Sequence, residues 1–221
     1  MTTAPVYAVS VLARAWLNDE VFELTCNRPP GFQFLAGQHV SIGLQDEERE
    51  YTILSPPDAT ELRFLIKQIK GGKLSSALAD LPPGSMLGMS KARGYLSFRP
   101  TPRQVFFVAT GVGIAPFVAM AAAGVRGFTL VHGARTVAGF FYRQELMAAA
   151  QQYIPCISGT PLSSPGLPGL YHGYVTEYIK THLQPGLYDF YLCGSIAMIR
   201  DVTLLLDQYH PDTRIYSEAY S

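Results

Sequence analysis

A cation, a flat ring and a hydroxyl lie close together in one strand-like segment, at Arg49, Tyr51 and Thr52. Side chains two residues apart on a strand point to the same face, so Arg49 and Tyr51 should project together and Thr52 to the other face. A guanidinium beside an aromatic ring suits a ligand that joins a phosphate to a planar heterocycle. Many edge strands carry such a pair, so its meaning depends on the motifs that follow.

A glycine-rich turn at 71–76 precedes a short helix predicted over 74–80. Glycines let the backbone approach an anion closely, and a helix N-terminus offers N–H groups without intrahelical partners. Ser75 or Ser76 would be the N-cap or a donor to a phosphate. The alternative is an ordinary capped helix that binds nothing.

The segment 104–116 has the order of a dinucleotide-binding unit. An apolar strand runs into Gly111-Val112-Gly113, and Pro116 suits the first turn of the helix that follows. The order matches the dinucleotide fingerprint, with Pro116 at the third glycine position. The alternative is a purely structural strand-to-helix turn.

Two further strand ends could meet a ligand, because ligands of α/β sheets bind at the carboxyl ends of strands. After the strand 128–132 no acid is available for a ribose 2′-hydroxyl, and Arg135 favours a 2′-phosphate unless it is a solvated loop cation. Cys193 ends a strand at 188–193, which places it to meet a ligand. The alternative is that Cys193 is a small buried hydrophobic residue, which is the commoner role of a cysteine outside disulfides.

The composition excludes several classes of protein. The chain has 221 residues, 48% of them hydrophobic, so it can bury a sizeable core and is not disordered. A formal net charge of zero and the lack of a basic run argue against a nucleic-acid partner. The run 105–125 carries no charge, but its glycines and Pro116 favour a strand, a turn and a packed helix over a membrane span.

Cysteines and histidines give no sign of a metal site. Cys26, Cys156 and Cys193 are far apart and form no Cys-x-x-Cys, which argues against a zinc or iron–sulfur site and predicts a reducing, cytoplasmic location. The first five residues do not resemble a signal peptide. The histidines, with no metal-ligand spacing, are interpreted as structural or surface residues: His39, His132 and His172.

The predicted elements divide the chain near residue 100. Before it, short strands at close spacing predict an antiparallel β-barrel or sandwich over 1–100. After it, strands alternate with helices and predict a parallel α/β nucleotide-binding domain over 101–221. The predicted strands are 6–12, 21–26, 37–44, 49–57, 62–69, 104–110, 128–132, 188–193 and 215–217, and the predicted helices are 74–80, 116–123, 143–152, 175–182 and 197–209.

In this order the motifs resemble those of the ferredoxin–NADP reductase family of flavoproteins, over nearly the whole chain. Each motif is moderately specific, and their common order is very specific. The matching motifs are Arg49-x-Tyr51-Thr52 with Ser55 and Pro57, Gly72-x-x-Ser75, Gly111 to Pro116, Cys193-Gly194 with Met198, and Ser217-Glu218-Ala219-Tyr220.

The resemblance implies a barrel that binds FAD, with FMN as the alternative, and a second domain that binds NADPH or NADH. Hydride would pass from the nicotinamide to the flavin, and electrons would then reach a separate acceptor protein, a ferredoxin or an oxygenase component. The catalytic residues would be Thr52, Cys193, Glu218 and Tyr220. The cofactor-binding residues would be Arg49, Tyr51, Thr52, Ser55, Ile66, Lys67, Gly72, Lys73, Leu74, Ser75, Thr110, Gly111, Gly113, Ile114, Pro116, Arg135, Cys193, Gly194 and Met198.

Departures from the family pattern leave alternatives open. Val112 stands where Thr is usual, and 156–160 lacks the further Arg of NADPH-dependent relatives, which offsets the indication from Arg135. The chain has neither the length nor the cysteines for a fused [2Fe–2S] domain. A non-catalytic redox sensor and a partner-dependent electron-transfer subunit remain rival functions of the same fold.

Overall fold

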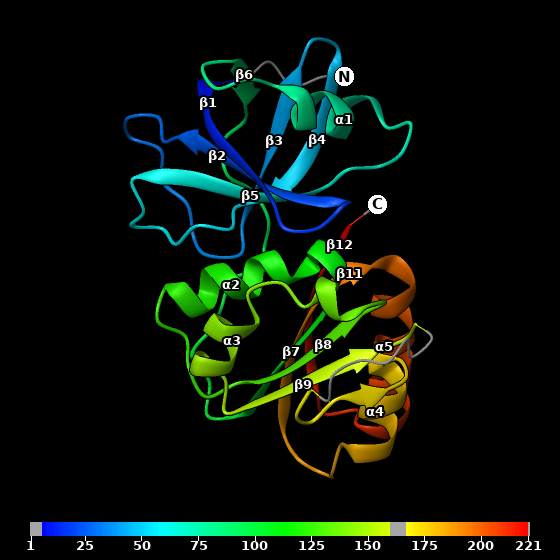
Figure 1. The fold of residues 1–221 in the computed structure, drawn as a ribbon. Helices are drawn as coiled ribbons and strands as arrows, with labels where there is room; N and C mark the ends of the chain where they lie inside the picture. Colours follow the sequence, from blue (N-terminus) through cyan, green and yellow to red (C-terminus); the bar gives the residue numbers. More distant parts are fainter. Residues whose placement is uncertain (1–5, 160–166, 221) are drawn as a thin grey trace.

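The computed structural model describes residues 6–159 and 167–220, arranged as two domains stacked end to end (Figure 1). The first five residues, used in the signal-peptide argument, lie outside the described part. The side chain of Tyr220 also lies outside it, although the backbone of Tyr220 ends the last strand.

The first domain is a six-stranded antiparallel sheet that curls into a near-barrel. The strand order is β4-β3-β6-β1-β2-β5, and a bridge between Ile53 and Phe64 brings the two edges together. Alternation of side chains along a strand explains its core: Phe22, Leu24 and Cys26 of β2 are all fully buried. The predicted antiparallel barrel is thus confirmed. Its elements are β1 (Tyr7–Trp16), β2 (Val21–Asn27), β3 (His39–Leu44), β4 (Glu47–Thr52), β5 (Glu61–Lys67), α1 (Lys73–Asp80) and β6 (Met86–Met89).

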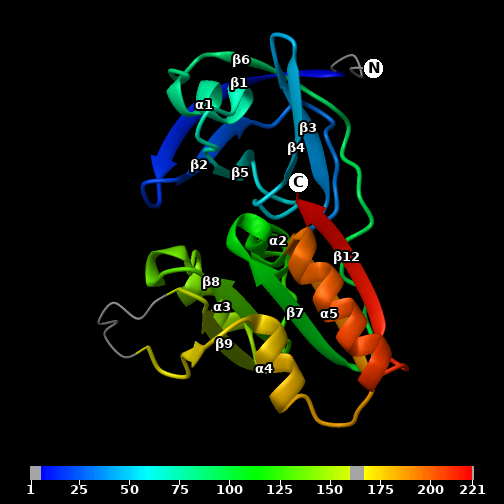
Figure 2. The ribbon, with the colours of Figure 1, turned by 90° about the vertical axis from the view of Figure 1, so that its right-hand side faces the viewer.

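The second domain is a parallel sheet with helices on both faces, as predicted (Figure 2). Along β7, Phe107 and Ala109 pack into the cluster that contains α2 and α3, whereas Val108 packs into the cluster of α4 and α5. The strand order is β10-β9-β8-β7-β11-β12. Its elements are β7 (Gln104–Thr110), the 3-10 turn η1 (Gly111–Ile114), α2 (Ala115–Ala122), β8 (Thr129–Ala134), η2 (Val137–Gly139), α3 (Arg143–Ala149), β9 (Gln152–Ile157), β10 (Tyr171–His172), α4 (Val175–His182), β11 (Tyr188–Ser195), α5 (Ile196–Tyr209) and β12 (Arg214–Tyr220).

The uncharged run 105–125 forms β7, η1 and α2, so the interpretation as strand, turn and packed helix is confirmed. Among the described residues, no helix has the length and apolar character needed to cross a bilayer. Helix α2 lies between the sheet and the first domain (Figure 1). Leu54, Leu65 and Leu96 of the first domain share its buried cluster. Burial of each leucine stabilises by about 2 kcal/mol, which favours a fixed domain arrangement.

Some predicted element boundaries were wrong. The helix predicted over 143–152 ends at Ala149, and Gln152 already belongs to the buried strand β9, which the sequence analysis missed. Pro155 within β9 weakens the strand pattern, because proline is unusual inside a sheet. Strands β6 and β10 were also missed, since each is very short. Residues 158–169, which their Gly, Pro and Ser content predicts to form a loop, lie mostly outside the described part.

Candidate active site between the two domains

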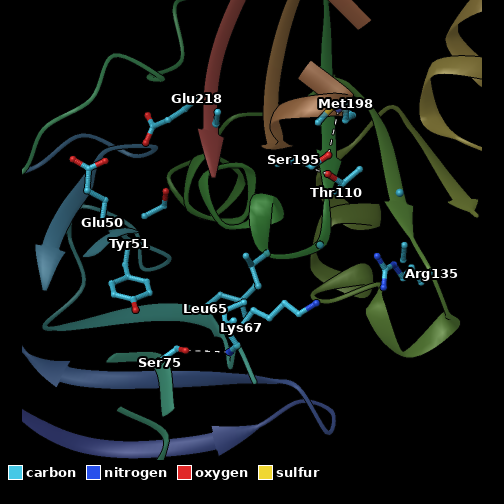
Figure 3. Close-up of a pocket in the computed structure, with 18 of the residues that line it drawn as sticks. Glu50, Tyr51, Leu65, Lys67, Ser75, Thr110, Arg135, Ser195, Met198 and Glu218 are labelled. Carbon is cyan, nitrogen blue, oxygen red and sulfur yellow. Dashed lines mark hydrogen bonds between the residues drawn. The ribbon is translucent and has the colours of Figure 1, made fainter. Parts of the chain in front are cut away.

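A cavity of about 860 Å³ lies between the two domains and receives side chains from both. The first domain lines it with β4, the end of β5 and the start of α1. The second domain lines it with the carboxyl ends of parallel strands β7, β8, β11 and β12. Figure 3 shows Tyr51 and Ser75 on one side and Thr110, Ser195 and Met198 on the other. A cleft at the carboxyl ends of parallel strands is the usual ligand site of α/β folds.

Edge strand β4 contributes its cation, its ring and its hydroxyl together to the cavity. Arg49, Tyr51 and Thr52 all line it, and Thr52 is 4% exposed. Strand β4 is at the edge of its sheet. Burial raises the pKa of Tyr51 to about 12, although nearby Arg49 opposes the shift, so the phenol is neutral at physiological pH.

Two exposed cations flank the start of α1. The Arg49 guanidinium lies 3.5 Å from one Glu47 carboxylate oxygen, and Lys73 Nζ lies 3.0 Å from the other. Both cations also line the cavity. Exposed ion pairs hold their partners weakly, so an anion in the cavity can take over both cations from Glu47.

The glycine-rich turn is built around Ser75. The Ile69 N–H donates to Ser75 Oγ at 3.0 Å, which leaves the hydroxyl proton available to a ligand. The N-cap of α1 is Gly72, so the alternative that Ser75 or Ser76 caps the helix was wrong. A Cβ on Gly72 would lie 3.0 Å from Ile69 atoms and from Ser75 Oγ, which leaves little room for a side chain. The α1 amides, the two cations and the Tyr51 ring fit a diphosphate attached to a flat heterocycle.

The opposite wall depends on close packing of two strand ends. The Ser195 N–H donates to Thr110 Oγ1 at 3.2 Å, which joins β11 to β7 beside the cavity. A Cβ on Gly194 would overlap Thr110 Oγ1, and a Cβ on Gly113 would overlap the Cys193 carbonyl. The glycine turn can therefore lie flat against β11 only because these two positions lack a side chain.

Several predicted cofactor residues do not line the cavity. Gly113 and Ile114 are the buried residues of η1, and Pro116 is buried in the first turn of α2. Ile66 is fully buried, and Ser55 Oγ accepts from the Arg63 N–H at 3.2 Å inside the first domain. These residues support the walls of the site, and a direct cofactor contact from them stays a prediction.

Cys193 is likewise fully buried and belongs to the cluster around α2. Its neighbours Gly194 and Ser195 line the cavity, together with Met198, whose N–H donates to the Ser195 N-cap at 3.3 Å. The packing agrees with the alternative of a small buried hydrophobe, and the catalytic role of Cys193 stays a prediction.

The remaining predicted residues reach the cavity, apart from Tyr220, whose side chain lies outside the described part. Among the described lining residues of the second domain, Arg135 is the single cation, and Figure 3 shows it at the end away from Tyr51. Thr110, Gly111 and Leu74 line the walls, and Lys67 does so while its Nζ lies 3.1 Å from Glu20.

His39 and Glu50 line the cavity but were not predicted as site residues. His39 is not a surface residue: its side chain is 13% exposed, lines the cavity and contacts Glu218 of β12. Glu50 lines the same side and lies between Arg49 and Tyr51 in the sequence. The one available sequence signal was the position of Glu50 inside the Arg-x-Tyr segment, whereas nothing local to His39 indicated a partner 179 residues away.

Comparison with known proteins agrees with this geometry. Residues 16–98 match the family model of the oxidoreductase FAD-binding domain, and residues 107–203 match that of the oxidoreductase NAD-binding domain. The flavodoxin/ferredoxin–NADP reductase of Escherichia coli strain K12 is 27% identical over 205 residues, covering 83% of this chain and 82% of that protein. The toluate 1,2-dioxygenase electron transfer component of Pseudomonas putida is 32% identical over 184 residues, which cover 77% of this chain.

The chain spans 53% of that second relative's length. Among solved structures, a ferredoxin NADP+ reductase from Neisseria gonorrhoeae with bound FAD and NADP has the same fold. It has a TM-score of 0.85 and 20% identity, and the match covers 96% of this chain and 98% of that one.

Fold, cavity and both family models define a two-domain flavoprotein oxidoreductase, with an FAD-binding domain followed by an NAD-binding domain. More particularly, the chain belongs to the ferredoxin–NADP reductase family, as its resemblance predicted. The matched domains contain no iron–sulfur domain.

Proposed function

We propose that this chain oxidises NADPH or NADH and passes the electrons through bound FAD to a separate one-electron acceptor. The observation that carries the proposal is the shared cavity, which has an anion-binding helix start and a flat ring on one wall and the ends of parallel strands on the other. Bound FAD supplies the conversion of a two-electron hydride donor into single electrons, a chemistry that the protein positions.

On the first wall, Arg49 and Lys73 neutralise the diphosphate, while the amides of Gly72 to Ser75 and the Ser75 hydroxyl bind its oxygens. The Tyr51 ring packs beside the heterocycle and excludes water from it. Thr52, which is 4% exposed and lines the cavity, presents its hydroxyl to the same region.

On the second wall, the turn at Gly111 and the start of α5 at Ser195 hold the nicotinamide dinucleotide across the strand ends. Positioning of two reactants in one cavity accounts for much of the acceleration that such sites achieve. Glu218 lines the cavity between the walls, where its carboxylate would relay protons, and Tyr220 follows two residues later on β12.

For the acceptor we propose a ferredoxin, a flavodoxin or an oxygenase component. The names of the relatives support these classes, since one reduces flavodoxin or ferredoxin and another serves a dioxygenase. The redox sensor and the partner-dependent subunit remain the alternatives. The cytoplasmic location stays a prediction from the sequence.

An anaerobic titration tests the function. NADH and NADPH are added separately to the purified yellow protein while the flavin absorbance band is followed. Bleaching by either donor is the expected result and identifies the preferred donor. A yellow protein that neither donor bleaches would favour the sensor or the partner-dependent subunit, and a colourless protein that cannot be reconstituted would contradict a flavin enzyme.

Arg135→Ala should change the choice of donor. Arg135 is the cation at the end of the cavity away from Tyr51, where a 2′-phosphate would lie. Loss of a charge-assisted hydrogen bond costs about 1.5 kcal/mol, so KM for NADPH should rise roughly tenfold while KM for NADH changes little. Steady-state kinetics with both donors measures it. Arg200→Ala, on the exposed side of α5, is the control, and equal changes for the two donors would contradict this role.

Cys193→Ala should slow flavin reduction about tenfold and leave the bound flavin in place. Without the sulfur, the end of β11 should shift into the vacated space and misplace the nicotinamide site. Stopped-flow reduction and flavin content are the measurements. Cys26→Ala removes an equally buried sulfur from the first domain and is the control. If both variants lose only thermal stability, Cys193 has a packing role alone.

A further inference from the structure

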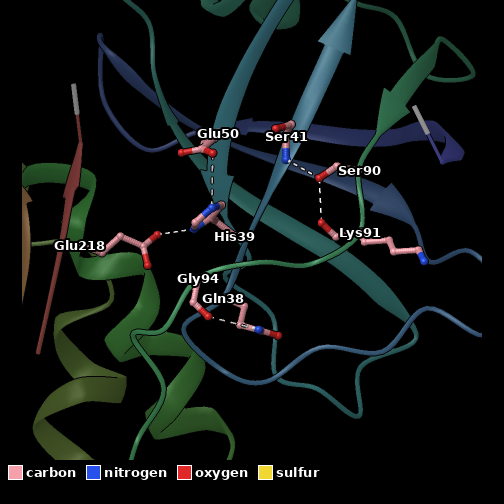
Figure 4. A network of polar contacts seen from close by, with 8 residues as sticks. All are labelled: Gln38, His39, Ser41, Glu50, Ser90, Lys91, Gly94 and Glu218. Carbon is pink, nitrogen blue, oxygen red and sulfur yellow. Dashed lines mark hydrogen bonds and ion pairs between the residues drawn. The ribbon is translucent and has the colours of Figure 1, made fainter. Parts of the chain in front are cut away.

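Three ionisable side chains from two domains meet in a row at the edge of the cavity (Figure 4). His39 of β3 lies in the middle: its Nδ1 is 2.5 Å from a Glu218 carboxylate oxygen, and its Nε2 is 3.5 Å from Glu50. The Glu50 side chain is 63% exposed, whereas those of His39 and Glu218 are only 13% and 17% exposed. The row therefore leads from solvent to the cavity wall.

The packing around His39 fixes its ring. A backbone bridge joins His39 to Arg93 at 2.9 and 2.8 Å. Gly94 then passes so close that a Cβ there would lie 2.8 Å from His39 Nδ1 and 3.0 Å from a Glu218 oxygen. With a φ of +98° at Gly94, the segment suits glycine in both space and backbone conformation.

The position of the Glu218 side chain depends on its contact with His39. It lies on β12, the last strand in the sheet order, which pairs with β11 on one side. The His39 contact joins this edge strand to the first domain, close to the point where β12 ends (Figure 1). Without that contact, the Glu218 side chain would have several rotamers available to it.

The charges around His39 favour the imidazolium. The hydrogen bond to Glu218 raises the His39 pKa most, and the charges of Glu218 and Glu50 add to it, while burial and Arg93 oppose. These are the charged groups that face the ring from β12, β4 and the 90–94 segment. As imidazolium, His39 donates from Nδ1 to Glu218 and offers its other N–H to Glu50.

We propose that His39 is a positioning residue that holds the Glu218 carboxylate, and with it the end of β12, at the flavin cavity. Its effect on the reaction rests on the proposed function, because Glu218 matters there only if hydride transfer occurs in this cavity. The contact between His39 and Glu218, here called the clasp, is a property of the protein without cofactor, so it can be tested separately.

Histidine NMR titration of the whole protein is the first test. In the wild type the His39 pKa should lie above that of a free histidine, and in Glu218→Gln it should fall. His172, exposed on β10, gives a reference signal in the same spectra. An unchanged His39 titration in Glu218→Gln would overturn the proposal.

Thermal unfolding is the second test. A histidine whose folded pKa is raised stabilises fully below its unfolded pKa and loses that stabilisation as the pH rises through the folded pKa. His39→Gln keeps a neutral donor but does not titrate. Its Tm should be about 3 °C below wild type near pH 6, and the gap should nearly vanish near pH 9. His39→Ala, which loses the donor, should be less stable at both pH values. A gap for His39→Gln that does not change with pH would refute the clasp.

Flavin reduction provides the third readout. His39→Gln should lower the maximal rate about tenfold near pH 6 with little change in nicotinamide KM, because Glu218 is misplaced rather than the donor site, and the difference should shrink towards pH 9, where His39 is neutral in the wild type as well. A pH–rate profile identical to wild type would overturn the positioning role. If the wild type itself is not reduced by either donor, the proposed function fails, whereas the NMR and unfolding results still decide the clasp.

Discussion

The double variant Arg49→Ala, Lys73→Ala is expected to leave purification nearly free of flavin. These two cations flank the start of α1; both lie in exposed ion pairs with Glu47, and Arg49 also donates to the Glu48 carbonyl at 2.7 Å. Each charge-assisted contact to a diphosphate contributes about 1.5 kcal/mol, so their joint loss should raise the Kd for FAD roughly a hundredfold. Removal of both cations also leaves the Glu47 carboxylate beside the diphosphate, where it repels.

The measurement is flavin content after gel filtration, followed by an FAD titration of the apoprotein. Each single variant should show an intermediate loss, about tenfold in Kd. Arg14→Ala, Lys91→Ala is the matched control, since it changes net charge equally at exposed positions outside the cavity. FAD affinity equal to the control would show that the α1 start does not hold the diphosphate.

Gly194→Ala should nearly abolish reduction by the nicotinamide while FAD remains bound. The new Cβ would overlap Thr110 Oγ1 and lie about 3 Å from the Thr110 backbone, so β11 and the glycine turn must separate. A displacement of about an ångström at reacting groups costs roughly a hundredfold in rate, and the Ser195–Thr110 hydrogen bond should be lost as well.

Gly194 also has a φ of +144°, so strain must be separated from overlap. Gly124→Ala is the control: Gly124 has a φ of +99° and nothing within 4 Å of a Cβ, so it reports backbone strain without a clash. Stopped-flow reduction and Tm are measured for both variants. If Gly194→Ala loses stability like Gly124→Ala but is reduced at the wild-type rate, the packing of β11 on β7 does not shape the site.

Local patterns predicted the elements well where a short run of neighbours decides the outcome. The two-residue period of β2 and the Gly111-x-Gly113 turn into α2 both follow from backbone geometry and from burial of one face or both. The same reasoning failed at β9. Pro155 disfavours a strand locally, but β9 forms because it pairs with the neighbouring strands β8 and β10. Local propensity is overridden there by pairing between distant segments.

The same distinction between local sequence patterns and tertiary contacts applies to the site. Residue types and their order were enough to predict the two-domain fold, its FAD- and NAD-binding domains and the family, because the motifs that indicate them depend on conformations set within a few residues. The tertiary arrangement determined which of them reach the cavity. It placed Arg49 and Tyr51 on a wall, buried Cys193 behind another, and joined His39 to Glu218 across 179 residues. Such contacts depend on how β12 and β3 are brought together when the domains pack, and no local period carries that information.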